Sequence, residues 1–175
     1  MGSSRKQMDE DGVAETISLA ARRLASPAFT SLFRQGMALI DETAAYLDGE
    51  GRTASRGLAR GVLAAYAQQS LQLSTRLMQL ASWLLLRRAV LEGDMSEESA
   101  LRESARIDLD GPRRDLDQEA ELPAQLAALV RRSHELQRQI VKLDAALRAP
   151  AETAGLRPND VAGQIGKLRS AFERH

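Results

Sequence analysis

One segment of this sequence keeps a single apolar face through about ten helical turns, and no other feature limits the possible folds as strongly. Between residues 57 and 91, the members of this face recur at alternating spacings of three and four. That spacing is typical of a helix that packs against other helices in a bundle. The members are Leu63, Tyr66, Ser70, Leu73, Leu77, Leu80 and Leu84.

A second apolar line lies on a neighbouring face of the same segment, at Ala64, Leu71, Met78 and Leu85. The segment then closes with four apolar residues that cover every side of a helix, Trp83, Leu84, Leu85 and Leu86. One partner helix cannot cover two faces and a fully apolar end. We therefore predict that this helix is central to the bundle and that its four closing residues form a dimer or partner interface. The alternative is that the following segment folds back and covers them.

Cap residues and glycines indicate the ends of the first two long helices. Ser26 before Pro27 is a typical helix start, and the apolar stripe that follows predicts a helix over residues 27–48. Gly36 lies in the middle of this stripe, which indicates the close approach of another helix. Glycines at positions 49 and 51 predict a turn. The central helix then spans residues 53–92 and stops at Gly93.

A third long helix is predicted from Leu122 and Pro123 to the residues before Pro150. Its seam is uninterrupted, at Leu122, Leu126, Leu129, Ser133, Leu136, Ile140, Leu143 and Leu147. The connection over residues 92–122 carries 11 acidic residues against four Arg, which gives a local charge of −7. We predict a partly ordered crossover, with a short helix capped by Ser96 and with Ile107, Leu109 and Leu116 as anchors. A solvated loop without a role is the alternative.

These segments together predict an all-α fold, a three-helix bundle over residues 27–148 with an acidic crossover at 92–122. Residues 1–26 form an N-terminal extension, in which Asp11 starts a short amphipathic helix that includes Leu24. Residues 149–175 form a flexible tail. Four apolar residues of the tail share one helical face, and we predict that they form a binding element that orders on contact with a partner, unless they pack on the bundle. They are Val161, Ile165, Leu168 and Phe172.

The composition argues against several classes of function. The 175 residues include no cysteine, so disulfides, thiolate metal sites and a cysteine nucleophile are excluded. A formal net charge of zero and an aromatic content of 3% argue against nucleic acid as a partner. The apolar run of residues 83–86 stops at two arginines and is far too short to span a membrane. No signal peptide begins the sequence, so we expect a cytoplasmic protein.

Little in the sequence points to catalysis. Its histidines are His134 and His175, and neither forms a Glu-x-x-His pair of the kind that dinuclear metal bundles use. We expect no cofactor, no metal and no enzymatic activity. A histidine phosphotransfer module that acts through an exposed His134 stays open as an alternative. The arginine pairs at 87–88 and 131–132 are expected to lie on solvated faces or to form ion pairs with the acidic crossover.

Two stretches carry a family resemblance. Residues 29–49, FTSLFRQGMALIDETAAYLDG, resemble the first core helix of the RcdA family, the alphaproteobacterial regulators of CtrA degradation. Residues 75–86, TRLMQLASWLLL, resemble the second core helix of that family. The third helix agrees with the family in its apolar pattern.

This resemblance implies a three-helix bundle that forms a homodimer and has no catalytic activity. It implies an adaptor for the ClpXP protease that acts with the response-regulator-like protein CpdR. The implied cargo includes the cell-cycle regulator CtrA, with a further adaptor, PopA, that binds cyclic di-GMP. Localisation at the cell pole is also implied. A purely structural helical oligomer is the remaining alternative.

Overall fold

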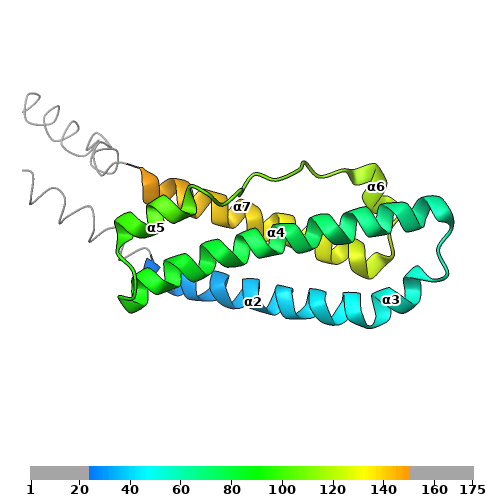
Figure 1. The fold of residues 1–175 in the computed structure, drawn as a ribbon, viewed down its shortest axis with the longest axis horizontal. Coiled ribbons are helices and arrows are strands. Elements are labelled where there is room, and N and C mark those ends of the chain that lie inside the picture. Colours follow the sequence, from blue (N-terminus) through cyan, green and yellow to red (C-terminus); the bar gives the residue numbers. More distant parts are fainter. Residues whose placement is uncertain (1–23, 150–175) are drawn as a thin grey trace, which may run out of the picture. The chain divides into compact units, whose positions relative to one another are not determined.

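The computed structural model describes residues 24–149, and this part of the chain is all-α, as predicted. Its helices are α2 (Pro27–Asp48), α3 (Glu50–Ser55), α4 (Arg60–Glu92), α5 (Glu97–Ser104), α6 (Leu116–Ala120) and α7 (Ala124–Arg148) (Figure 1). The chain divides into two compact units, and residues 20–147 form the one to which these helices belong. Most of the expected N-terminal helix and the predicted tail helix fall outside the described residues.

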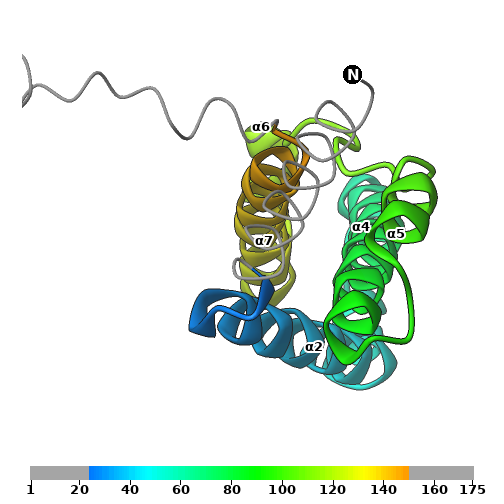
Figure 2. The ribbon, with the colours of Figure 1, turned by 90° about the vertical axis from the view of Figure 1, so that its left-hand side faces the viewer.

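The three long helices, α2, α4 and α7, form the predicted bundle (Figure 2). Local chemistry sets their ends. Ser26 caps α2 by accepting a hydrogen bond from the Phe29 backbone N–H at 3.4 Å, and Pro27 occupies the first turn. Gly93 ends α4 in the left-handed conformation, with φ of 81°, which only glycine adopts readily. The predicted bounds of α2 and the predicted stop of α4 are therefore confirmed.

Most members of the two predicted seams face the core. On α4, Leu73, Leu77, Leu80 and Leu84 are buried, and only Leu63 near the start of the helix is exposed. On α7, the seam is buried from Leu126 to Ile140 and half-buried at Leu143 and Leu147. Gly36 of α2 is also buried, and a Cβ placed there would lie 2.5 Å from Cδ1 of Leu84. The predicted close approach at Gly36 is thus an approach of the Leu84 side chain.

The central helix is shorter than predicted. A helix from residue 53 to 92 was expected, but α3 ends at Ser55 and α4 begins at Arg60. Between them, Ala59 has extended backbone and offers no side-chain cap, and Gly57 has low helix propensity. Gly51 lies inside α3 instead of stopping a helix. The position requires a glycine because a Cβ there would lie 2.7 Å from Cε1 of Tyr46 and 2.7 Å from the hydroxyl oxygen of Tyr66.

The acidic crossover folds back along the bundle between α4 and α7 (Figures 1 and 2). Ser96 caps α5 as predicted, by accepting a hydrogen bond from the Ser99 N–H at 3.2 Å. Ile107 and Leu109 pack against the core, and the Gln137 side chain of α7 donates to the Leu109 carbonyl at 2.6 Å. Leu116 is 63% exposed, so its prediction as an anchor is wrong.

Candidate protein-interaction surface

The outer face of α4 carries an exposed apolar line, formed by Leu71, Met78 and Leu85. These side chains are 69%, 66% and 52% exposed. Because they are seven residues apart, they lie along one side of the helix over about 20 Å. Between residues 61 and 86, the sole charged side chain of α4 is Arg76, and it is buried. The outer face is therefore uncharged and its large exposed hydrophobic side chains form a line, with the small polar Ser74, Thr75 and Ser82 beside them, which is uncommon for a face in contact with water.

A groove accompanies this line on each side. The groove between α2 and α4 has a volume of about 290 Å³ and is lined by Ile40, Thr43, Ala44, Leu47, Ser74, Leu77, Met78 and Ala81. The groove between α4 and the crossover has a volume of about 420 Å³ and is lined by Ser82, Leu85, Leu86, Ala89, Glu103, Arg106 and Ile107. Met78 and Leu85 thus stand at the edges of two grooves that a partner side chain can enter.

The four residues predicted as an interface divide between core and surface. Trp83 and Leu84 have no exposed area and pack in the core, so neither can contact a partner while the bundle is folded. Leu85 is exposed. Leu86 is half-buried beside Ile107 of the crossover, as the fold-back alternative expected. A partner contact by Leu85 and Leu86 stays a prediction.

The sequence pattern found the line through Leu71 and Met78 but did not assign it to the site. The sequence alone does not distinguish an apolar helix residue that faces the core from one that faces a partner. The exposed fraction of each side chain in the structure makes this distinction. The four tail residues with the predicted binding role, Val161, Ile165, Leu168 and Phe172, lie outside the described residues.

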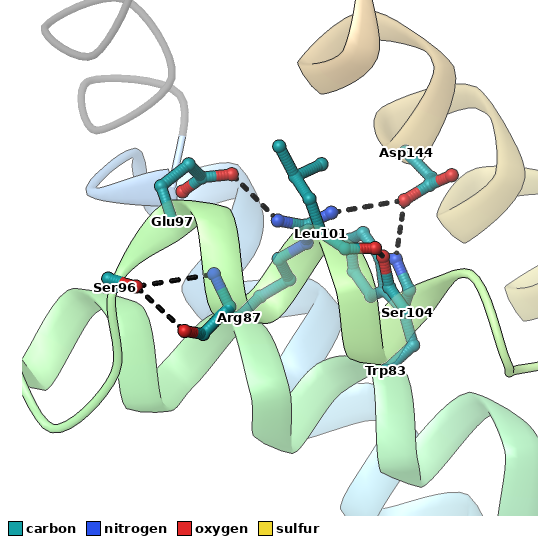
Figure 3. Close-up of polar contacts among 8 residues, drawn as sticks. Trp83, Arg87, Ser96, Glu97, Leu101, Ser104 and Asp144 are labelled. Carbon is teal, nitrogen blue, oxygen red and sulfur yellow. Dashed lines mark hydrogen bonds and ion pairs between the residues drawn. The ribbon is translucent and has the colours of Figure 1, made fainter.

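A buried polar network fixes the end of α4 that carries Leu85 (Figure 3). Arg87 is fully buried, and its guanidinium forms ion pairs with Glu97 of α5 at 2.8 Å and with Asp144 of α7 at 3.2 Å. The same oxygen of Asp144 accepts a hydrogen bond from Trp83 Nε1 at 2.8 Å. The guanidinium carbon also lies 5.4 Å from the centroid of the Trp83 ring. Three helices are thereby held in one register.

The predicted ion pairing of the arginines is confirmed for Arg87, which meets Glu97 of the crossover. Its neighbour Arg88 pairs with Glu92 at 2.7 Å and lies 4.8 Å from the centroid of the Phe33 ring. Arg132 pairs with Glu42 of α2 at 2.7 Å. These arginines thus serve contacts within the bundle.

His134 is half-buried on α7 rather than exposed as predicted. Burial lowers its pKa, and the positive charge of Arg76 adds to this effect, so the imidazole is neutral at pH 7. Among residues 24–149, no cluster of His, Cys, Asp or Glu is suited to hold a metal ion. None of the helices in this range combines the length and the apolar character needed to cross a membrane.

The fold and this surface define a helical-bundle protein whose most unusual exposed feature is the uncharged outer face of α4 with its line of apolar side chains. The family described as "Protein of unknown function (DUF1465)" matches residues 20–172. The crystal structure of RcdA from Caulobacter crescentus CB15 matches with a TM-score of 0.60 and 42% sequence identity, over 71% of this chain and 94% of the RcdA chain. No curated protein matches the sequence. The chain belongs to the RcdA family, as the resemblance of its helices predicted.

Proposed function

We propose that this protein is a non-catalytic adaptor that promotes the regulated degradation of cell-cycle regulators such as CtrA by the ClpXP protease. The observation that carries the proposal is the 42% identity to RcdA, which extends over 94% of the RcdA chain. The uncharged apolar face of α4 supports it, because an adaptor acts by contacting other proteins. The partners expected are ClpXP with CpdR, a CtrA-type cargo and a PopA-type adaptor. A cytoplasmic location, at the cell pole, belongs to the same proposal.

The occupant proposed for the α4 face is a second copy of this chain. Full burial of an exposed Leu or Met side chain contributes ~1.5–3 kcal/mol, so side chains that are about 60% exposed contribute ~1–2 kcal/mol each. A two-fold interface buries the exposed line, Leu71, Met78 and Leu85, from both subunits, which gives ~6–12 kcal/mol. Association costs ~4–15 kcal/mol, so these side chains alone support a weak dimer and the neighbouring grooves must add contacts.

Substituting Met78 tests the dimer and the adaptor role together. Met78→Glu places two carboxylates in the middle of a two-fold interface and should convert the dimer to a monomer in light scattering. In a reconstituted reaction with ClpXP, CpdR and a CtrA-type cargo, the same variant should slow degradation.

Leu116→Glu is the matched control, because Leu116 is equally exposed but lies on α6, outside the α4 line. It should retain both the mass and the rate. If the wild-type protein does not accelerate degradation at all, the adaptor function is refuted. If Met78→Glu stays dimeric, the interface assignment alone is refuted.

The tail is proposed as a second contact, for cargo. Its four apolar residues, Val161, Ile165, Leu168 and Phe172, have the helical spacing of a peptide that docks its apolar side in a groove. Deletion of residues 159–175 should then weaken cargo delivery and leave the melting temperature nearly unchanged. A truncated chain that melts much lower would assign the tail to the fold instead.

A further inference from the structure

Helix α4 contains two buried arginines, and only one of them meets a carboxylate. Arg87 has Glu97 and Asp144, as described above. Arg76 is 6% exposed, and its NH1 group donates to the Ser133 hydroxyl at 2.9 Å. Its Nε, like that of Arg87, is buried without a hydrogen-bond partner among residues 24–149. A buried cation that has no carboxylate in contact is costly, and this separates Arg76 from Arg87.

Glu119 is the carboxylate that most affects Arg76 electrostatically, but it is already bound elsewhere. Both of its oxygens accept hydrogen bonds from Arg114, from Nε and NH2, at 2.6 Å each. Burial is the larger influence on Arg76 and lowers its pKa, while the charge of Glu119 opposes that shift. Arg76 therefore remains a desolvated positive charge that no carboxylate of residues 24–149 contacts.

Arg76 lines a cavity of about 220 Å³ between α4, the crossover and α7. Leu80, Leu109 and Pro112 supply apolar walls, and the side chains of Gln72 and Gln79 supply amide groups. The roof of the cavity is held in place because Gln137 Nε2 donates to the carbonyls of residues 109 and 110, at 2.6 and 2.5 Å. An apolar cavity with a few polar groups at one point is typical of a small-molecule site.

Asp108 also lines the cavity, but it is engaged by its own turn. Its Oδ1 accepts hydrogen bonds from the backbone N–H groups of Asp110 at 3.1 Å and Gly111 at 3.0 Å. It forms no ion pair with Arg76 within the described part of the chain. The negative charge of Asp108 should weaken the binding of an anion in the cavity slightly, so replacement of Asp108 by a neutral residue should strengthen it.

We propose that this cavity binds a small organic acid, with the carboxylate on Arg76 and the apolar body against Leu80, Leu109 and Pro112. A desolvated guanidinium that has no carboxylate in contact among residues 24–149 is well suited to a carboxylate ligand. The volume lies below the ~300–1,000 Å³ of most ligand pockets, so the ligand is small. A dry cavity of about 150 Å³ is known to accept benzene, so a benzoate-sized molecule suits this one. The proposal adds a ligand site to the protein and does not depend on the adaptor function.

Calorimetry with benzoate and with benzamide, its neutral counterpart, tests the proposal on the full-length chain. Benzoate should bind with a Kd below about 1 mM. Benzamide should bind at least tenfold more weakly. In NMR spectra, benzoate should shift the side-chain Nε–H resonance of Arg76.

Two variants assign the binding to this cavity. Arg76→Met keeps the size of the side chain and should weaken benzoate binding at least tenfold without lowering stability, because it removes a buried charge that has no carboxylate. Asp108→Asn should tighten benzoate binding two- to fivefold. The second variant keeps the test informative if Arg76→Met fails to fold.

Three results would overturn the proposal. The first is that benzamide binds as tightly as benzoate. The second is that Arg76→Met or Asp108→Asn binds benzoate with the affinity of the wild type. The third is that benzoate does not bind at millimolar concentration.

Discussion

Replacement of Asp144 by alanine removes the carboxylate that joins α7 to the end of α4. Asp144 is 9% exposed and receives Trp83 Nε1 and Arg87 NH2 on one oxygen. In Asp144→Ala, the indole N–H and one side of a fully buried guanidinium lose their acceptor. Glu97 still pairs with Arg87, so part of the compensation for the buried charge remains.

The size of the effect follows from these contacts. Breaking a buried ion pair by removal of one partner costs ~3–5 kcal/mol, and the remaining pair with Glu97 places Asp144→Ala near the lower end, at about 3 kcal/mol. Asp144→Asn retains an acceptor for the indole N–H and loses only the charge, so about 1–2 kcal/mol is expected. The double variant Arg87→Met with Asp144→Leu should be more stable than Asp144→Ala, because it removes the fully buried charge and leaves unpaired only Glu97, whose side chain is 21% exposed.

Urea unfolding measures these differences, and Trp83 is a built-in probe because the chain has one tryptophan. With a slope of ~2 kcal/mol per M, Asp144→Ala should shift the midpoint by about 1.5 M. Circular dichroism provides a second probe that does not depend on the environment of the indole. A loss below 1 kcal/mol, or a double variant less stable than Asp144→Ala, would refute the view that Arg87 is a desolvated charge that needs Asp144.

Two further substitutions test other parts of the bundle. Gly36→Leu should destabilise the protein by ~1–3 kcal/mol in thermal unfolding, because its side chain would displace the buried Leu84, and a rise in stability would contradict the packing at Gly36. His134→Gln should leave adaptor-supported degradation intact, and a loss of activity would favour the phosphotransfer alternative. Because the pKa of His134 is lowered in the folded state, the stability from its neutral form is complete above pH 6.5 and is lost as the pH falls below that value. The wild type should therefore lose more stability between pH 7 and pH 5 than His134→Gln does.

The sequence predicted those elements whose signals are local. The start of α2 follows from Ser26 and Pro27, the end of α4 from Gly93, and the cap of α5 from Ser96, and each of these acts within one helical turn. The start of α4 was missed because no capping side chain marks Arg60, while the apolar segment assigned to the helix begins earlier, at residue 57. A periodic pattern indicates a helical face but does not require that the helix be continuous.

The site was less predictable, because its assignment depends on contacts far apart in the chain. Trp83 and Leu85 have the same apolar character, yet the first is fully buried and the second is 52% exposed. Asp144, which accepts the hydrogen bond from the buried Trp83 indole, is 61 residues away in the sequence. Arg76 and Arg87 likewise read as surface residues of a helix, and only the assembled bundle indicates that both are buried.

The positions of these two arginines also explain how α4 joins its neighbours. They are 11 residues apart, which is close to three helical turns, so both lie on the side of α4 that faces α7. There Arg76 meets Ser133 and Arg87 meets Asp144, so α7 is positioned by polar groups that fit one register only. The α2 side of α4 instead meets apolar partners such as Phe29, whose ring lies 6.4 Å from that of Trp83.

Ion pairs with arginines also explain part of the acidity of the crossover. Glu97 of the crossover forms an ion pair with Arg87, and Glu119 forms one with Arg114. Two carboxylates of the crossover are therefore bound to arginines. α4 uses one side for apolar packing and another for buried arginines, so among residues 24–149 its outer face is the side that the other helices leave exposed. Between residues 61 and 86 this face carries no charge. A partner that docks there therefore meets a surface whose position is fixed from behind by α2, α5 and α7.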